Sequence, residues 1–319
     1  MRPTLRQIEY FIAVAEHRAF GAAATALAVS QPSLSKQLAA MEAELGTRLF
    51  ERTSRSVTLT PTGRAVLARG RSILNEVRDF KAIAKGAASL FAARLSIGVL
   101  PSVGAYFMPI ANRRLHQLYP DLRLVVQEGA TRDLLEMLRD GRIDAVIGAP
   151  TNDPDFDSVP LFEETLWICA ASDDPLSSDR GPVRLVDLAD RPLLSLSAGF
   201  SLHDLVQRLA SEAGTYVSRD YEGASLDAVR QMAVMGAGIA VLPSLYALAE
   251  AVRDPEFIVR RLDHPDAVHA IALHWRRTSP AEDFKRLAAD LVQVKGEIRS
   301  ARGNRFDQAA NSGPPSRRA

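Results

Sequence analysis

The fold of the N-terminal segment is decided by the stretch Ser30-Gln31-Pro32-Ser33-Leu34-Ser35-Lys36-Gln37. Ser30 is a favourable helix N-cap, and Pro32 fits the first helical turn because the backbone N–H that it lacks has no partner there. From this start apolar residues recur at helical spacing and form one stripe, which contains Leu34, Leu38, Met41 and Leu45. Gly46 is a typical residue for ending a helix. The stretch therefore predicts a helix that begins with polar side chains.

Two further helices are predicted before this one. Residues 4 to 17 carry an apolar stripe at the spacing of an amphipathic helix, and an alanine-rich helix follows at about 21 to 28. Two short helices joined by a tight turn are typical of a helix-turn-helix, whose second helix fits the major groove of B-DNA and reaches the base edges with its first turn. The exposed face of the predicted second helix carries Gln31, Ser35 and Lys36, which are suitable side chains for reading bases.

The segment from Leu49 to Leu59 is predicted to form two short strands around a polar tip, which is the wing of a winged helix. Arg52 and Arg55 lie at this tip, where arginine can contact phosphates or the minor groove. Either residue can equally be an ordinary exposed surface arginine.

A fourth helix is predicted to begin at Pro61, with Thr60 as its N-cap. Small and apolar residues then follow a heptad pattern, at Val66, Gly70, Ile73, Val77, Phe80, Ala84 and Ala87. We expect this helix to pair with a second copy of the chain through Val66, Ile73, Val77 and Phe80. The alternative is that the stripe packs on its own domain.

The length and composition indicate a protein of two or more domains with a basic N-terminal segment. The chain has 319 residues, of which 47% are apolar. Residues 1 to 94 hold 14 Lys or Arg against 7 Asp or Glu, whereas the rest holds 25 against 31. A basic segment of this kind suits a polyanion, because binding releases counterions. The N-terminus has no signal-peptide pattern, no run of apolar residues is long enough to cross a membrane, and the lone Cys169 forms no internal disulfide, so we expect a cytoplasmic protein.

The body of the chain alternates between strand and helix patterns after a small-residue hinge at 86 to 93. The predicted strands include 95–100, 122–127, 143–148 and 239–242, and the predicted helices include 104–118, 131–140, 201–213 and 281–297. Such alternation favours a parallel sheet covered on both faces. The tail from about residue 298 is expected to be disordered, since it carries Gly-Pro-Pro and scattered arginines.

Ligands of α/β sheets settle beyond the carboxyl ends of the strands, against helix N-termini. Four loops with hydroxyl side chains occupy such positions, and their residues are also the commonest helix caps. Together they predict an effector pocket, which we assign to Ser102, Val103, Thr131, Ser197, Phe200, Ser201 and Ser225. Helix N-termini favour a small effector that is polar or anionic.

The first seventy residues resemble the DNA-binding domain of LysR-type transcriptional regulators. The resemblance is carried by Val29-Ser30-Gln31-Pro32-Ser33-Leu34-Ser35, Leu49-Phe50-Glu51-Arg52 and Leu59-Thr60-Pro61-Thr62-Gly63. It implies that Gln31, Pro32, Ser35 and Lys36 approach the bases and that Arg52 and Arg55 contact the backbone or the minor groove. With their neighbours, the DNA-binding residues are therefore expected to be Gln31, Pro32, Ser33, Ser35, Lys36, Arg52, Thr53 and Arg55.

Residues 94 to about 291 resemble the two-lobed effector domain of the same family. The expected fold is therefore an N-terminal all-α winged helix-turn-helix (1–60) with a long linker helix (61–90), followed by an α/β two-lobed, periplasmic-binding-protein-like (type 2) effector domain (94–297). Lobe I is expected at about 94–162 and 268–297, and lobe II at about 163–267. The resemblance implies a dimer or tetramer that binds double-stranded DNA and a small effector and that can contact RNA polymerase.

Within that family the body is most similar to the OxyR-type peroxide regulators, through Gly98 to Tyr106, Leu193 to Asp204 and Ala224 to Pro243. Where that branch carries its peroxide-reactive cysteine this chain has Ser201, and the position of the resolving cysteine falls near Ala210. A serine cannot follow the oxidation steps of a thiolate, so we expect no disulfide switch.

Three other functions compete with this interpretation. An enzyme would need Ser201, His203 and Asp204 to act together, but residues one or two apart on a helix do not face one another. No phosphate-binding G-x-x-x-x-G-K-[ST] or zinc-binding H-E-x-x-H pattern occurs, and we expect no metal or cofactor. A solute-binding protein is compatible with the body but not with the basic helix-turn-helix. A peroxide-linked regulator that acts without cysteine oxidation is the third alternative.

Overall fold

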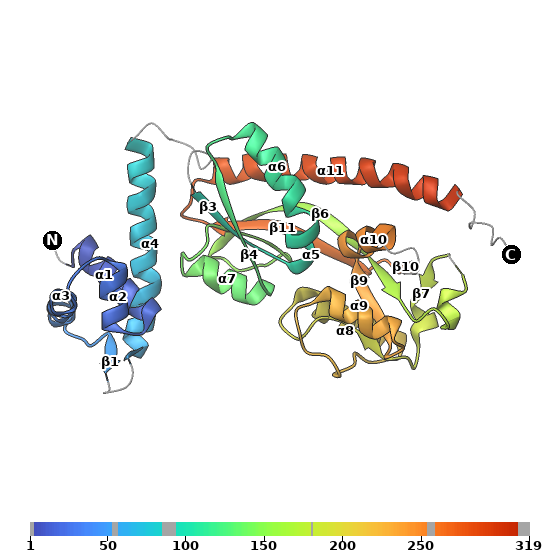
Figure 1. The fold of residues 1–319 in the computed structure, drawn as a ribbon, viewed down its shortest axis with the longest axis horizontal. Helices are drawn as coiled ribbons and strands as arrows, with labels where there is room; N and C mark the ends of the chain where they lie inside the picture. Colours follow the sequence, from blue (N-terminus) through green and yellow to red (C-terminus); the bar gives the residue numbers. More distant parts are fainter. Residues whose placement is uncertain (1–2, 53–56, 85–93, 180, 254–258, 312–319) are drawn as a thin grey trace. The chain divides into compact units, whose positions relative to one another are not determined.

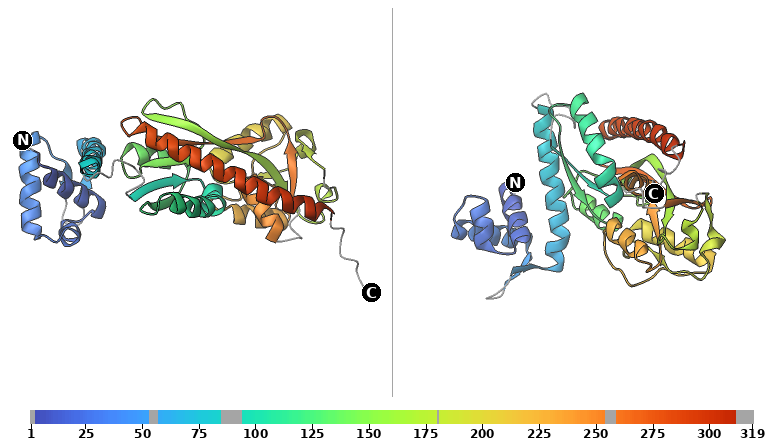
Figure 2. Two further views of the ribbon diagram at one scale, coloured as in Figure 1. Left: turned by 90° about the horizontal axis from the view of Figure 1, so that it is seen from above. Right: turned by 45° about the vertical axis from the view of Figure 1, so that its right-hand side comes forward.

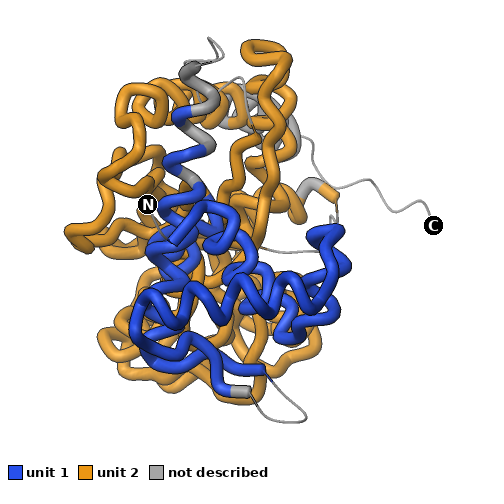
Figure 3. The backbone as a smooth tube through the Cα atoms, turned by 90° about the vertical axis from the view of Figure 1, so that its left-hand side faces the viewer, with its two compact units in different colours: residues 1–89, 136–143 blue, residues 90–135, 144–319 orange. Residues whose placement is uncertain are grey.

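The computed structural model describes residues 3–52, 57–84, 94–179, 181–253 and 259–311. Contacts divide the chain into two compact units, residues 1–89 with 136–143 and residues 90–135 with 144–319 (Figure 3). None of the helices in the described ranges is long and apolar enough to cross a membrane. The expected hinge at 86–93 lies outside the described residues.

Three short helices and a two-stranded antiparallel hairpin form the N-terminal fold (Figure 1), namely α1 (Leu5–His17), α2 (Phe20–Ala26), α3 (Gln31–Leu45), β1 (Phe50–Arg52) and β2 (Val57–Leu59). Their apolar faces meet in one core around Phe11, Leu34, Leu38 and Leu49, each fully buried. The predicted winged helix-turn-helix is therefore confirmed.

Local signals fix the ends of these helices. A capping box of Thr4 and Gln7 begins α1. Between α2 and α3 the chain turns through Ala28, which has a left-handed φ of 53°. Ser30 caps α3, since its Oγ accepts from the Ser33 N–H at 3.4 Å, and Gly46 ends that helix with a φ of 63°.

The long helix α4 (Pro61–Ala84) begins beside the hairpin. The Thr60 hydroxyl accepts from the Gly63 N–H at 2.9 Å and donates to the Arg48 carbonyl at 2.8 Å, so one side chain caps the helix and holds it to the wing. A Cβ at Gly63 would lie 2.1 Å from the Leu49 carbonyl oxygen. Only glycine therefore allows this approach of the two backbones.

The second unit is built on a sheet with the strand order β4-β3-β5-β11-β6-β10-β7, where β9 also pairs with β6 and β8 with β9. Its strands are β3 (Arg94–Val99), β4 (Arg123–Glu128), β5 (Ala145–Gly148), β6 (Phe156–Cys169), β7 (Val183–Arg184), β8 (Leu193–Leu194), β9 (Ile239–Pro243), β10 (Val259–Asp263) and β11 (Val268–Arg276).

The sheet is mixed, which corrects the expectation of a parallel sheet. β3 pairs in parallel with β4 and β5, and β8 with β9, but β11 is antiparallel to both β5 and β6. β6 is also antiparallel to β9 and β10. The reason is that the chain leaves the first group of strands along β6 and returns along β11, so these two long strands run in opposite directions.

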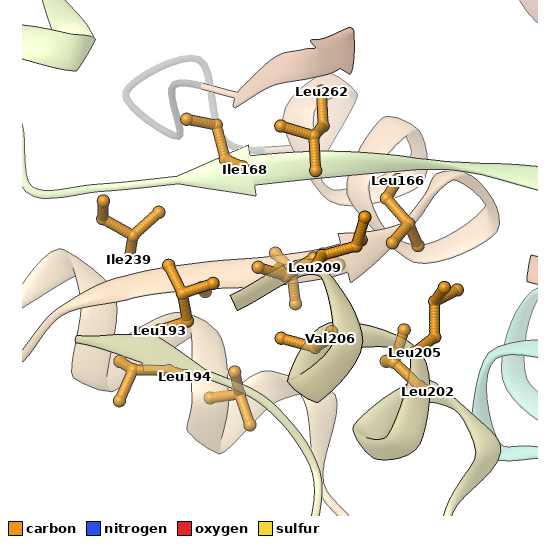
Figure 4. Close-up of a cluster of buried hydrophobic side chains, with 14 of the residues drawn as sticks. Leu166, Ile168, Leu193, Leu194, Leu202, Leu205, Val206, Leu209, Ile239 and Leu262 are labelled. Carbon is orange, nitrogen blue, oxygen red and sulfur yellow. The ribbon is translucent and has the colours of Figure 1, made fainter. Parts of the chain in front are cut away.

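Two hydrophobic cores make two lobes of this unit. The first lobe packs α5 (Pro101–Tyr106), α6 (Met108–Leu118) and α11 (Ala281–Asn311) on its strands (Figure 2). In the chain, α7 (Thr131–Arg139) follows β4. The second lobe is filled by leucines, isoleucines and valines of β6, β8, β9, β10 and α8 (Ser201–Ala213), with α9 (Leu226–Val234) and α10 (Ser244–Arg253) around them (Figure 4).

Two helix predictions need correction. The helix expected at 104–118 begins at Pro101 and divides at Phe107, because Pro109 cannot supply the N–H that a continuous helix needs. The last helix, α11, continues to Asn311, beyond residue 298 where a disordered tail was expected. No proline interrupts the chain between these two positions, and the Gly-Pro-Pro of the tail follows Asn311. Residues 312–319 lie outside the described residues.

Candidate functional site

The first turn of α3 presents the predicted base-reading residues to solvent. Gln31, Pro32, Ser33 and Lys36 are exposed and Ser35 is half-buried, whereas Leu34 and Leu38 on the other face are fully buried. The buried leucines hold the helix on its core, so the polar face is free for a partner. Uncharged and cationic side chains of this kind match base edges and phosphates of a DNA groove.

Side-chain hydrogen bonds fix α3 to its neighbours. The Gln7 amide of α1 donates to the Gln37 backbone carbonyl at 3.3 Å. At the other end, the Glu42 carboxylate accepts from the backbone N–H groups of Leu49 and Phe50, at 2.8 and 3.2 Å. α3 and the first strand of the wing are therefore held in one orientation.

The wing is described only in its two strands. Arg52 pairs with Val57 in the hairpin, and its backbone is the last described point before the tip. The predicted contacts of Thr53 and Arg55 lie outside the described residues.

The heptad stripe of α4 divides into two parts. Val66 packs against the N-terminal core, and a Cβ at Gly70 would lie 3.2 Å from Ile8, so this part faces its own domain. Further along the helix, Ile73 is 43% exposed and Phe80 71%, and Val77 is half-buried. An apolar surface that its own domain leaves uncovered thus begins at Ile73.

In the second unit, a buried carboxyl group connects the two lobes. Glu164 of β6 has no exposed side-chain surface. One of its oxygens accepts from the Ser102 hydroxyl of α5 at 3.1 Å, and the other accepts from the Leu245 backbone N–H at 3.0 Å. Leu245 lies in the first turn of α10, where helix N–H groups favour a carboxylate.

His269 lies between Glu164 and Ser201, in close contact with the first and hydrogen-bonded to the second. It lies directly opposite Glu164 in the pairing of β11 with β6, and its Nδ1 is 3.6 Å from the Glu164 carboxylate. Its Nε2 is 2.9 Å from the Ser201 hydroxyl, at the first residue of α8. Nδ1 is buried without a hydrogen bond among the described residues. The path Ser102-Glu164-His269-Ser201, which we call the interlobe relay, therefore joins α5 of the first lobe to α8 of the second.

A small cavity adjoins the interlobe relay. It measures about 10 Å³, and Ser102, Phe200, Ser201 and His269 are among the residues that line it. This is room for about one water molecule. The structure thus brings together three of the predicted effector residues, Ser102, Phe200 and Ser201.

The other predicted effector residues lie elsewhere. Val103 is fully buried in the first-lobe core, and Ser197 lines a separate cavity of about 900 Å³ along α8. Ser225 caps α9, where its hydroxyl accepts from the Ala228 N–H at 3.2 Å, and it lines a third cavity. The Thr131 hydroxyl is buried without a hydrogen-bond partner among the described residues and is not part of the small cavity's lining.

Glu164 and His269 are the residues of this candidate site that the sequence analysis missed. A signal for Glu164 was present, because it alternates with the buried Leu166 and Ile168 and so falls on the inner face of β6. A charged residue at an inward position requires partners. No local sequence pattern predicted that His269 would lie opposite Glu164 in the sheet.

The serine, histidine and acid that the sequence places together form no catalytic relay. His203 directs its Nδ1 to the Leu196 carbonyl at 2.8 Å, and Asp204 is exposed. The interlobe relay contains the residue types of a hydrolase triad, but the adjoining cavity has no room for an ester substrate.

One group of potential metal ligands occurs among the described residues, Glu212, His264 and Asp266. The Asp266 backbone N–H donates to His264 Nδ1 at 3.3 Å, so Nε2 carries the proton and donates to Glu212 at 3.0 Å. Both ring nitrogens are therefore engaged in hydrogen bonds.

Comparison with known proteins identifies both parts of the chain. Residues 5–64 match the bacterial regulatory helix-turn-helix proteins of the lysR family, and residues 88–294 match the LysR substrate binding domain. The DNA-binding transcriptional dual regulator OxyR of Escherichia coli K12 is 35% identical over 305 residues, which cover 95% of this chain and 97% of that protein.

Solved structures agree with this relationship. A full-length OxyR variant from Pseudomonas aeruginosa is 30% identical with a TM-score of 0.76 and covers 92% of this chain and 95% of its own. A cysteine-to-serine variant of OxyR from Corynebacterium glutamicum, solved with H2O2 bound, is 33% identical with a TM-score of 0.65, and 96% of this chain and 97% of that chain are covered.

This chain has one cysteine, Cys169, which is buried in the second-lobe core, so it lacks a redox pair. The family consists of transcription regulators and not of enzymes. The chain belongs to the LysR family and is a DNA-binding transcription regulator with an effector-binding domain.

Proposed function

We propose that the regulator binds a small polar effector between its two lobes and that the bound effector changes the affinity or the bend of its operator DNA. The observation that supports this proposal most strongly is the interlobe relay, because it joins α5 to α8 through buried polar groups. A ligand that hydrogen-bonds to Ser102 or Ser201 competes with these bonds. It thereby favours one arrangement of the lobes over another.

The proposed DNA contacts are Gln31, Pro32, Ser33, Ser35 and Lys36 of α3, together with Arg52, Thr53 and Arg55 of the wing. Exposure of the α3 residues supports the first group. We place the protein in the cytoplasm, where its DNA target lies, and RNA polymerase is a further proposed partner.

The proposed dimer forms along α4 through Ile73, Val77 and Phe80, and two dimers form the tetramer. Val66, which was also expected in this interface, packs against its own core. Exposure of Ile73 and Phe80 supports this interface. Replacing both by Ser should convert the oligomer to a smaller species in light scattering coupled to size-exclusion chromatography. Val292→Ser is the matched control, because Val292 on α11 is also 43% exposed. An unchanged mass for the double variant would place the interface elsewhere.

Peroxide sensing without cysteine oxidation is the second candidate function. The relatives named hydrogen peroxide-inducible genes activators support it, and so does the OxyR variant with serine that was solved with H2O2 bound. A change of DNA binding with peroxide that persists in Cys169→Ser and disappears in Ser201→Ala would favour this candidate over a metabolite effector.

The proposed DNA contacts are tested by fluorescence anisotropy with the intergenic duplex upstream of the gene. Ser35→Ala with Lys36→Ala should weaken specific binding about tenfold to a hundredfold, since each lost contact to a base or a phosphate costs on the order of 1 to 2 kcal/mol. Raised salt should weaken binding steeply, because binding releases counterions. Lys285→Ala is the control, as it removes an exposed lysine from the second unit. Equal affinity of the double variant and the parent chain would refute the assignment of α3.

A further inference from the structure

A third cavity lies between the lobes, next to the small one, with which it shares Pro101 and Leu226. Its volume is about 480 Å³, which is within the usual range of small-molecule sites. Tyr106 of α5 and Glu128 at the end of β4 line it from the first lobe. Tyr221, Asp227 of α9 and Tyr246 of α10 line it from the second. We call it the tyrosine cleft.

The phenol oxygens of the tyrosine cleft are already engaged within the protein. The Tyr106 hydroxyl donates to Glu250 at 3.0 Å, and the Tyr246 hydroxyl donates to Asp227 at 3.1 Å. The Tyr221 hydroxyl accepts from the Ser225 backbone N–H at 3.0 Å. Burial raises the pKa of Tyr106 to about 12, so this phenol stays neutral at physiological pH.

Neutral aromatic rings attract cations through the negative electrostatic potential of their faces. Tyr106 already shows this preference, since the Arg253 guanidinium lies 5.9 Å from its ring centroid. The Tyr246 ring stands nearly perpendicular to that of Tyr106, with centroids 5.5 Å apart. The rings of Tyr106 and Tyr246 therefore line two sides of the cleft at different orientations.

The charges of the tyrosine cleft leave one carboxylate in excess. Asp227 forms an ion pair with Arg230 at 3.1 Å. Glu128 has no hydrogen-bond or ion-pair partner for its side chain among the described residues. Burial raises the pKa of Glu128, with no neighbouring cation to oppose the shift. None of the described residues that line the cleft is a Lys or Arg.

Gly104 leaves room for the Glu128 side chain, which is exposed on its other side. A Cβ at Gly104 would lie 2.3 Å from the Glu128 carboxylate, so glycine at this position of α5 leaves the space that the carboxylate occupies. The unpaired carboxylate is thus packed against a helix backbone at the wall of the cleft.

We propose that the tyrosine cleft binds an organic cation, an ammonium group on an apolar or aromatic body. The ammonium lies at Glu128 and the body lies against the rings of Tyr106 and Tyr246. An anionic ligand would face the Glu128 carboxylate, and no Lys or Arg is among the described residues that line the cleft, so this assignment replaces the polar or anionic effector expected from the helix N-termini. That the cation is the regulatory effector rests on the proposed function, whereas its binding does not.

Binding is tested on the full-length protein by isothermal titration calorimetry with three probes of similar shape. Benzylamine is the cation, benzyl alcohol the neutral analogue and benzoate the anion. Benzylamine should bind at least about tenfold more tightly than either analogue. Equal affinity for the three probes, or preference for benzoate, would overturn the proposal.

Variants then locate the site. Glu128→Gln should lower benzylamine affinity about tenfold, to the level of benzyl alcohol, without lowering the melting temperature of the free protein, since the partly exposed carboxylate makes no hydrogen bond or ion pair among the described residues. Tyr106→Phe should retain binding and Tyr106→Leu should lose it several-fold. Glu163→Gln is the control, because Glu163 is exposed on β6. Undiminished benzylamine binding by Glu128→Gln would refute the site.

A DNA-binding measurement on the same samples separates this proposal from the proposed function. If the parent chain binds its operator but not benzylamine, the tyrosine cleft is refuted and the regulator is not. If it binds benzylamine through Glu128 and the amine changes no DNA affinity, the cation site stands and its regulatory role is refuted.

Discussion

The proposed reading residues of α3 and the interlobe relay are built in opposite ways. The α3 residues lie within six consecutive positions, Gln31 to Lys36, and most of them are exposed. The relay takes one residue each from α5, β6, β11 and α8, and the carboxylate and imidazole at its centre are buried. The residues of an exposed surface that binds a large partner can all come from one short continuous segment of the sequence. A buried polar site must bring its partners from distant segments, because every group in it needs another group to satisfy it.

This difference predicts that the interlobe relay is the more sensitive of the two to removal of a single side chain. Glu164→Ala leaves Ser102, His269 and the Leu245 N–H without their buried partner. The free energy of unfolding of the second unit should fall by about 3 to 5 kcal/mol. Thermal unfolding followed by circular dichroism measures this loss.

The neighbouring Glu163→Ala is the control, since Glu163 is exposed and should change stability by less than about 0.5 kcal/mol. Glu164→Gln keeps the shape and separates the loss of charge from the loss of packing. Equal stability of Glu164→Ala and Glu163→Ala would show that the relay contributes nothing to the fold.

In the N-terminal unit, the substitution with the largest effect on stability should be one at a backbone contact, and not one at a buried polar group. In Gly63→Ala the new Cβ would meet the Leu49 carbonyl oxygen at 2.1 Å, and neither backbone can move without loosening the wing. We expect a loss of about 1 to 3 kcal/mol in that unit and weaker DNA binding.

Gly296→Ala is the control for this substitution, because a Cβ there meets nothing within 4 Å and α11 should gain up to about 1 kcal/mol. If Gly63→Ala binds the operator as well as the parent chain does, α4 and the wing are not tightly coupled.

The same contrast explains what the sequence could predict. The two ends of α3 at Ser30 and Gly46, and the end of α8 at Gly214, follow from an adjacent cap or glycine and could be placed from local patterns. The pairing of Glu164 with His269 depends on the register of β6 against β11, two strands far apart in the sequence. Local periodicity does not contain that register. For the same reason the antiparallel course of these strands was missed.

The smallest predicted effect concerns a second histidine of β11. His274 is fully buried within the first-lobe sheet, and its Nε2–H donates to the Ala149 carbonyl at 3.0 Å. It has no carboxylate opposite it, in contrast to His269, and burial lowers its pKa below the usual 6.5. The folded protein therefore holds this imidazole neutral at a pH where the unfolded chain protonates it.

The sign of the pH dependence follows from this difference in proton binding. Above about pH 7 neither state is protonated at His274 and stability is unaffected. As the pH falls from about 6.5 toward the folded-state pKa, the unfolded chain takes up a proton first, so stability falls by at most about 1.4 kcal/mol per pH unit. His274→Gln should reduce this slope in urea unfolding between pH 5.5 and 7.5, whereas the exposed His116→Gln should not. Parallel pH profiles for the parent chain and His274→Gln would show that His274 does not contribute to the acid sensitivity of the second unit.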